Sequence, residues 1–412
     1  MNDLHLRRIV AVLLALIVGL SGIPGVLANP ATQEETPPVV LSPCEPPRPD
    51  NDGIFITYNT NIELDSELLQ GLFRQATNYV RRGTVMQAQR EYTQARRLYN
   101  YAIDYLNYLY DLYNGRGFAH AREGNPQEAI ADYLRAFSLS VNLADVYDRR
   151  GLTNVSLGNY EAAVRDIENA LKFVPQLRVS PAYAPAYYHV GNMQLEAHDY
   201  DAALASYSRA IELDPAYFEA YHKRGGVYLL LADYDEAVQD FSCGIVLDPD
   251  YTANYHLRGR ALAKAGQYDA AIEDFSRALE ANPRLALARI DRGLAYQAMG
   301  DLVQAITDFT WAILINPSQP EAYNLRGIAY TEAGLWSEAI ADYNRAISLD
   351  PTNAAYWNNR AWAQLQLNNH AGAQLDFLQF LLRLNLTLPR ALLEAYDYWF
   401  VPDLLDTGEA RG

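Results

Sequence analysis

The sequence predicts an all-α fold built from a repeated helical hairpin, and two regular spacings indicate it. Small residues recur every 34 residues, with one step of 40, at Gly83, Gly117, Gly151, Gly191, Gly225, Gly259, Gly293, Gly327 and Ala361. An alanine follows each of these positions by twelve residues, at Ala95, Ala129, Ala163, Ala203, Ala237, Ala271, Ala305, Ala339 and Ala373. A fixed period of this length is the mark of a repeat array, in which neighbouring units stack to share a core.

Residues 320–353 show how one period is built. Gly327 lies on the inner face of a first helix, and Tyr343 lies on the matching face of a second, because the apolar residues around each are spaced three and four apart. Gly334 breaks the chain between the two helices. Pro351 ends the second helix, since the residue before a proline is pushed out of the helical region.

The small residues mark a close crossing of the two helices. A glycine opposite an alanine lets the helices approach, and an aromatic side chain sixteen residues after the glycine fills the space beside them. We therefore assign a structural role to one set of glycines: Gly225, Gly259, Gly293 and Gly327. The aromatic is present in eight units, with Ile167 as the exception.

Units such as YHLRGRALAKAGQYDAAIEDFSRALEANP, which begins at Tyr255, resemble the tetratricopeptide repeat (TPR) family. The resemblance implies a right-handed superhelical solenoid of about nine TPR hairpins with a C-terminal capping helix. The predicted units occupy residues 76–387 and start near residues 76, 110, 144, 184, 218, 252, 286, 320 and 354. The first unit departs most: Met86 holds the position that Tyr330 holds in residues 320–353, Arg90 replaces the turn glycine, and Asn107 replaces the proline.

An arginine directly before the small residue accompanies an aspartate sixteen residues further on in seven units. Arg292 and Asp308 are one such pair. Both residues are replaced together in the fourth unit, whereas in the first unit Arg82 persists opposite Leu98. We expect a charge-assisted hydrogen bond between helices, with a structural role.

The N-terminal segment, residues 1–28, reads as a targeting signal. Two arginines precede an apolar run, and a small-residue pattern ends at Ala28. Cleavage after Ala28 is one interpretation; the other is that residues 9–27 are retained as a membrane anchor. Either one implies an extracytoplasmic protein that is secreted, periplasmic or held at the cell surface.

Other segments flank or interrupt the array. We expect a Pro-rich disordered linker over 29–53, an N-terminal capping segment over 54–75, a capping helix over 388–400 and a tail over 401–412. The helix over 388–400 has a second interpretation, as a docking segment. The step of 40 residues places six extra residues within 176–185, where a loop, a longer second helix or a hinge would each fit.

Composition limits the classes of partner. The formal net charge of −17 argues against nucleic acid and against an anionic membrane surface. The two cysteines, Cys44 and Cys243, set no disulfide framework, and pairing between them stays open.

A binding site is expected along the first helices, which line the inner wall of the solenoid that the resemblance implies. Toward the C-terminus this wall combines apolar and amide side chains: Leu287, Ile290, Leu294, Asn324, Ile328, Asn358 and Trp362. Apolar anchors and amides suit an extended peptide or a partner segment. The competing interpretation is that Leu294, Ile328 and Trp362 pack between neighbouring first helices.

No motif of a phosphate loop, a zinc protease or a nucleophile elbow is present. His189, His222 and His256 recur on successive first helices, but helix-pair spacing separates them too far for one metal ion. We therefore expect a non-catalytic protein-interaction scaffold without a cofactor or metal. The alternatives are a chaperone-like assembly factor for secreted or envelope proteins and, more distantly, a metal-dependent enzyme.

Overall fold

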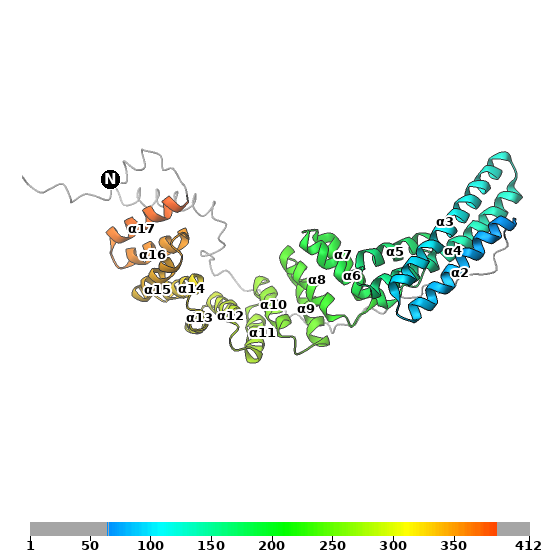
Figure 1. The fold of residues 1–412 in the computed structure, drawn as a ribbon. Coiled ribbons are helices and arrows are strands. Elements are labelled where there is room, and N and C mark those ends of the chain that lie inside the picture. The colour runs from blue at the N-terminus through cyan, green and yellow to red at the C-terminus, as the bar shows by residue number, and fades with distance from the viewer. Residues whose placement is uncertain (1–63, 65, 385–412) are drawn as a thin grey trace, which may run out of the picture. The chain divides into compact units, whose positions relative to one another are not determined.

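The computed structural model describes residue 64 and residues 66–384, and the regular elements in this part of the chain are all helices (Figure 1). The first six elements are α2 (Glu67–Ala88), α3 (Tyr92–Glu123), α4 (Pro126–Ser156), α5 (Tyr160–Phe173), the 3-10 helix η1 (Pro181–Tyr183) and α6 (Ala184–Glu196). The next six are α7 (Tyr200–Leu213), α8 (Phe218–Leu231), α9 (Tyr234–Leu247), α10 (Thr252–Lys264), α11 (Tyr268–Ala281) and α12 (Ala286–Ala298). The last five are α13 (Leu302–Ile315), α14 (Pro320–Glu332), α15 (Trp336–Leu349), α16 (Ala354–Gln366) and α17 (His370–Arg383).

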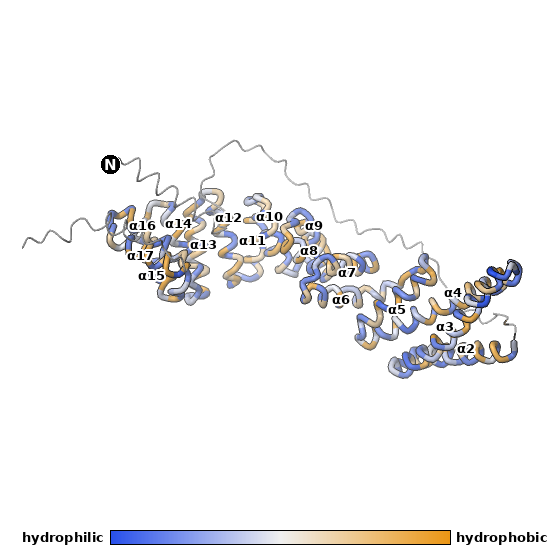
Figure 2. The backbone as a smooth tube through the Cα atoms, turned by 90° about the horizontal axis from the view of Figure 1, so that it is seen from above, coloured by the Kyte–Doolittle hydropathy of each residue, from blue (hydrophilic) through white to orange (hydrophobic). Residues whose placement is uncertain are grey.

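From α6 onward the helices pair into six hairpins, and each hairpin packs on the next along the chain. Apolar and polar residues alternate in short runs along each of these helices (Figure 2), so that one face of every helix enters a shared core. That core is a series of small clusters; in one of them, Val238 on α9 meets Ala261 and Leu262 on α10. The predicted all-α solenoid of stacked hairpins is therefore confirmed.

The turn inside each of the nine predicted hairpins contains one residue with a left-handed backbone, always seven residues after the small residue. Five of these residues are glycine: Gly124, Gly158, Gly266, Gly300 and Gly334. The other four are Arg90, His198, Ala232 and Asn368, at φ between 58° and 66°. A side chain at such a backbone costs about 1–2 kcal/mol, so packing of the two helices holds the turn even where glycine is missing.

A proline ends the second helix in six units. The residue before each proline is the helix C-cap and is extended, with φ near −135° and ψ near 90°: Val174, Asp214, Asp248, Asn282, Asn316 and Asp350. The conformation is the one that a following proline imposes. Asn107 and Val141 occupy the equivalent of the proline position in the first two units.

Without those prolines the helices do not stop. α3 continues through Asn107, and α4 continues through Val141. No helix therefore ends at the predicted unit boundaries near residues 110 and 144. The second helix of the first unit is fused to the first helix of the second, and the second helix of the second unit is fused to the first helix of the third.

This fusion moves the second repeat out of the stack. In later units the arginine before the small residue also reaches back to the preceding hairpin; Arg258, for example, donates from Nη1 to Ser242 Oγ at 3.0 Å. The equivalent Arg150 in the third unit donates to Asn100 Oδ1 at 3.0 Å. Asn100 belongs to the first unit and holds the same repeat position there as Ser242 does in the fifth. The third unit therefore stacks directly on the first.

The second repeat, residues 110–140, forms a hairpin with uncovered flanks. Tyr133 is 38% exposed, whereas its equivalent Tyr207 is fully buried. The side chains of Ile130, Leu134 and Phe137 lie on one stripe of α4 and are all largely exposed. In Figure 1 the turn between α3 and α4 lies beyond the end of α2, which is the geometry of a looped-out hairpin.

The extra residues of 176–185 form a loop that ends in η1 and contributes to the core. Tyr183 is fully buried, and its hydroxyl donates to the Asp148 carbonyl oxygen at 2.8 Å. A Cβ on Gly151 would meet the Tyr183 ring, whereas a Cβ on the other repeat glycines would meet the aromatic of the same unit. Tyr183 thus supplies the ring that Ile167 lacks, so the insertion compensates for the one aliphatic exception.

Several predicted segments lie outside the described residues: 1–28, 29–53, half of 54–75, 388–400 and 401–412. Residues 67–75 of the expected N-terminal cap are the first turns of α2. Within the described part, no helix is both long and apolar enough to cross a bilayer. Cys243, on α9, is buried and disulfide-bonded, and Cys44, the other cysteine of the sequence, is not among the described residues.

Candidate peptide-binding groove

The first helices of the later hairpins carry the residues predicted to line a groove. On α12, Leu287 is 57% exposed and Leu294 is 39% exposed. Ile290 lies between them in sequence but is buried, and it packs with Ile313 and Ala322 in a cluster between α12, α13 and α14. The structure therefore corrects the placement of Ile290, whose side chain belongs to the core between hairpins.

On α14 and α16 the predicted residues are half-buried. Asn359 donates from Nδ2 to Asn324 Oδ1 at 2.9 Å, which joins the two first helices. Ile328 packs against a cluster that contains Tyr343 and Ala363. Trp362 meets Phe377 edge to face, with ring centroids 5.8 Å apart. Asn324, Ile328 and Trp362 thus combine partial exposure with contacts to other helices, and Asn358 is half-buried.

Polar pairs join other first helices in the same way. His222 Nδ1 lies 2.7 Å from Asn254 Oδ1, and His256 Nε2 lies 2.8 Å from Asp291 Oδ2. Burial lowers the pKa of His222. Asn254 and Asp291 are not among the groove residues that the sequence predicts.

These pairs show that the histidines act between helices. Among residues 64 and 66–384, no group of three or more His, Cys, Asp or Glu side chains lies close enough to hold a metal ion. The recurrence of histidine on successive first helices thus brings no such cluster together in the described chain.

The arginine and aspartate of all seven units form a two-pronged hydrogen bond between the two helices of one hairpin. The Nε and Nη2 atoms donate to the two carboxylate oxygens at 2.6–3.0 Å. This includes the predicted pair of Arg292 and Asp308. Such fork-to-fork contacts fix geometry as well as add energy, so the pairs hold the first helices that carry the groove.

The surroundings of the carboxylate differ along the chain. Burial raises the pKa of Asp274 in a stacked hairpin despite the hydrogen bond from Arg258. In the looped-out hairpin the hydrogen bond from Arg116 dominates and lowers the pKa of Asp132. Both carboxylates are buried, but the arginine side chain is 36% exposed in the looped-out pair and 15% exposed in the stacked pair. Loss of one partner should therefore cost more in the stack.

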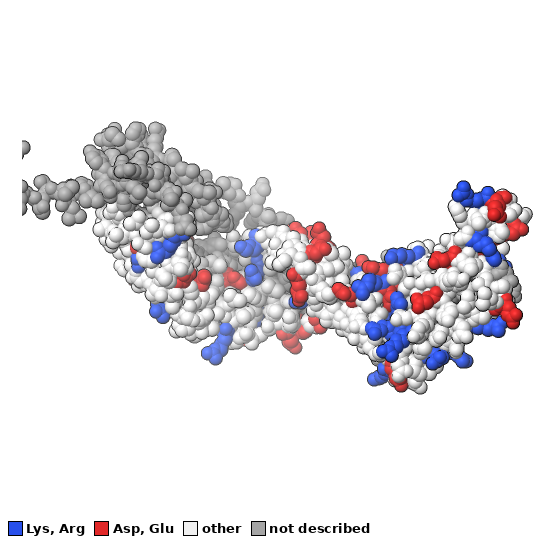
Figure 3. Space-filling view, turned by 45° about the horizontal axis from the view of Figure 1, so that its top comes forward, with Lys and Arg blue, Asp and Glu red and all other residues white. Residues whose placement is uncertain are grey.

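Charges of both signs are mixed over the face drawn in Figure 3. Lys and Arg side chains lie beside Asp and Glu there, and no continuous basic surface covers this face.

Stacked hairpins with a repeated crossing and a repeated ion pair define a helical repeat protein. Models of the tetratricopeptide repeat match residues 73–138, 144–176, 191–231, 259–300, 320–353 and 342–374. These matches cover more than half of the sequence, and the chain belongs to the tetratricopeptide repeat family.

Solved structures of other repeat proteins resemble the chain over part of its length. The MamA protein is 28% identical, over 42% of this chain and 94% of its own, with a TM-score of 0.39. YrrB, described as a TPR protein with an unusual peptide-binding site, is 25% identical over 42% and 89%, with a TM-score of 0.39. A tetratricopeptide repeat protein from Parabacteroides merdae is 19% identical over 61% and 96%, with a TM-score of 0.42. No curated protein matches the sequence.

Proposed function

We propose that this protein is a non-catalytic interaction scaffold that binds a peptide or a partner segment along the first helices of its later hairpins. The observation that carries the proposal is on α12, where Leu287 and Leu294 expose their apolar side chains while Ile290, between them in sequence, is buried. Repeat arrays present extended surfaces of this kind to other proteins.

The neighbouring helices add the polar part of the site. Asn324 and Asn358 are half-buried on α14 and α16, and amide side chains bond to a peptide backbone in an extended ligand. Apolar anchors flanked by such groups supply most of the affinity in peptide recognition. The ligand expected here is an extended segment with apolar side chains at intervals.

Substitution of the exposed leucines tests the proposal. We expect Leu287→Asp combined with Leu294→Asp to weaken binding at least about tenfold, because a charged group replaces an apolar anchor. The ligands are the peptides that the wild-type protein, residues 54–412, selects from a displayed random library, and their affinities are measured by fluorescence polarisation.

Leu314→Asp is the matched control. Leu314 is a largely exposed leucine on α13, which is a second helix and carries none of the predicted groove residues. Ile328→Asp is a poorer probe, since Ile328 also packs in the core. Equal affinities of the wild type and the double variant, or an equal loss with Leu314→Asp, would contradict the groove.

We further propose that the protein works outside the cytosol. The signal-like pattern of residues 1–28 supports this, and so does the disulfide at Cys243, since disulfides persist in oxidising compartments. Maleimide labelling of the denatured protein, taken directly from the cells that make it, should find no free thiol. Complete labelling of Cys243 without a reductant would contradict the proposed location outside the cytosol.

A further inference from the structure

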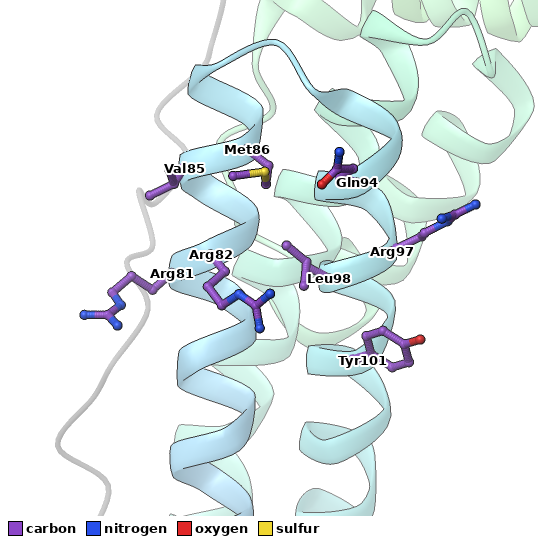
Figure 4. Close-up of a pocket in the computed structure, with 8 residues that line it drawn as sticks. All are labelled: Arg81, Arg82, Val85, Met86, Gln94, Arg97, Leu98 and Tyr101. Carbon is purple, nitrogen blue, oxygen red and sulfur yellow. The ribbon is translucent and has the colours of Figure 1, made fainter.

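A surface pocket of about 630 Å³ lies between α2 and α3, the two helices of the first hairpin. Its walls include three arginines: Arg81, Arg82 and Arg97. Figure 4 shows that Arg82 reaches into the space between the helices toward Leu98, whereas Arg81 and Arg97 point outward on either side. The remaining lining residues are Val85, Met86, Gln94, Leu98 and Tyr101, so no acidic side chain lines the pocket.

Arg82 is the only arginine at its repeat position that lacks an aspartate sixteen residues later. In the seven other units with this arginine, the aspartate accepts two hydrogen bonds from it, as Asp274 does from Arg258. Leu98 holds that position in the first unit. Arg82 has neither a hydrogen bond nor an ion pair with any residue that the structure describes. Its guanidinium therefore offers an unused pair of donors.

The charge around the pocket is opposite to that of the whole protein. Residues 74–97 contain six arginines and a single acidic residue, Glu91, in a chain of net charge −17. In the later units this face of the hairpin is covered by the preceding hairpin, whose side chain accepts from the arginine, as Ser242 accepts from Arg258. No earlier repeat precedes the first unit in the sequence.

We propose that this pocket binds a carboxylate side chain of a partner polypeptide, which takes the place of the missing aspartate. The carboxylate accepts from Arg82, and Arg81 and Arg97 at the two sides attract an acidic segment. This site lies on α2 and α3, apart from the groove residues, so its failure would leave the groove proposal intact.

The pocket walls favour a carboxylate on a peptide over a free anion. Val85, Met86 and Leu98 form an apolar wall beside the arginine, which suits an aliphatic side chain next to the acidic one. A guanidinium also matches the planar fork of a carboxylate, and the protein uses that match in seven of its own pairs. The ligand class is thus an acidic peptide segment with neighbouring aliphatic residues.

The test uses two terminally blocked pentapeptides, ALDLA and ALNLA, which differ only in the charge of the central residue. Calorimetric titration of the full chain at low salt should show binding of ALDLA and at least about tenfold weaker binding of ALNLA. Arg82→Ala should weaken the binding of ALDLA to the same extent. Arg284→Ala removes the same charge from an exposed site outside the pocket and should leave the affinity unchanged.

A second variant tests whether binding depends on Arg82 lacking an aspartate partner and not only on the positive charge of the surface. Leu98→Asp rebuilds the repeat pair within the hairpin, so Arg82 should be occupied and ALDLA should no longer bind, while the melting temperature should hold or rise. Unchanged binding of ALDLA to both Arg82→Ala and Leu98→Asp would overturn the proposal. Displacement of ALDLA by an equal concentration of inorganic phosphate would overturn the assignment to a carboxylate.

Discussion

Replacement of Arg258 by methionine is expected to lower the free energy of unfolding by about 3–5 kcal/mol, the cost of a buried charge that has lost its partner. Asp274 is 4% exposed, and Arg258 is the only residue that donates a side-chain hydrogen bond to it in the described structure. Urea unfolding followed by circular dichroism measures the effect. This pair is a cleaner choice than Arg292 and Asp308, because Arg289 also contacts Asp308 at 3.1 Å.

Two controls identify the mechanism. Arg258→Met combined with Asp274→Leu should recover most of the loss, because no charge is then left buried. Burial already raises the pKa of Asp274, and loss of the arginine raises it further. The folded state then holds its proton more tightly than the unfolded chain does, so the single variant should lose stability as the pH rises through the folded pKa. A loss independent of pH, or no recovery in the double variant, would refute the role of the pair.

Gly293→Leu is expected to destabilise the array by about 1–3 kcal/mol through overpacking. A Cβ at this position would lie 2.7 Å from Cε1 of Phe309, whose ring is fully buried. The denaturant midpoint of the variant measures the cost.

Gly226→Leu is the matched control, because a Cβ at Gly226 meets no atom within 4 Å. That substitution should be neutral or should stabilise slightly, since glycine is a poor helix former. Equal midpoints for Gly293→Leu and the wild type would mean that the helices do not cross where the repeat glycines place them.

The sequence predicts the stacked hairpins well because the contacts that define a hairpin join residues of the same repeat unit. Gly293 and Phe309 are sixteen residues apart in the same hairpin, and so are Arg258 and Asp274. Spacing alone therefore predicts both contacts. The turn of each hairpin also keeps its position, even where Ala232 replaces glycine.

Other features depend on contacts that cross the period. The missing prolines at Asn107 and Val141 are visible in the sequence, but the looped-out hairpin also requires that the first and third units fit together. Tyr183 fills the place beside Gly151 from an insertion that no repeat rule covers. In the groove, Leu287 and Ile290 are three residues apart and differ completely in exposure. A periodic pattern predicts which face of a helix a residue lies on. It does not predict whether a neighbouring helix or solvent covers the residue there.

The contact between Arg150 and Asn100 shows that the stack contains fewer hairpins than the sequence has repeats. The sequence has nine repeat units, but the third unit packs on the first as though the second unit were absent. The absence of two prolines can thus leave an internal hairpin looped out of the stack while the hairpins on both sides of it still pack on each other. Duplication of a repeat can in this way add a new surface to a TPR protein without displacing the ligand sites already spaced along it.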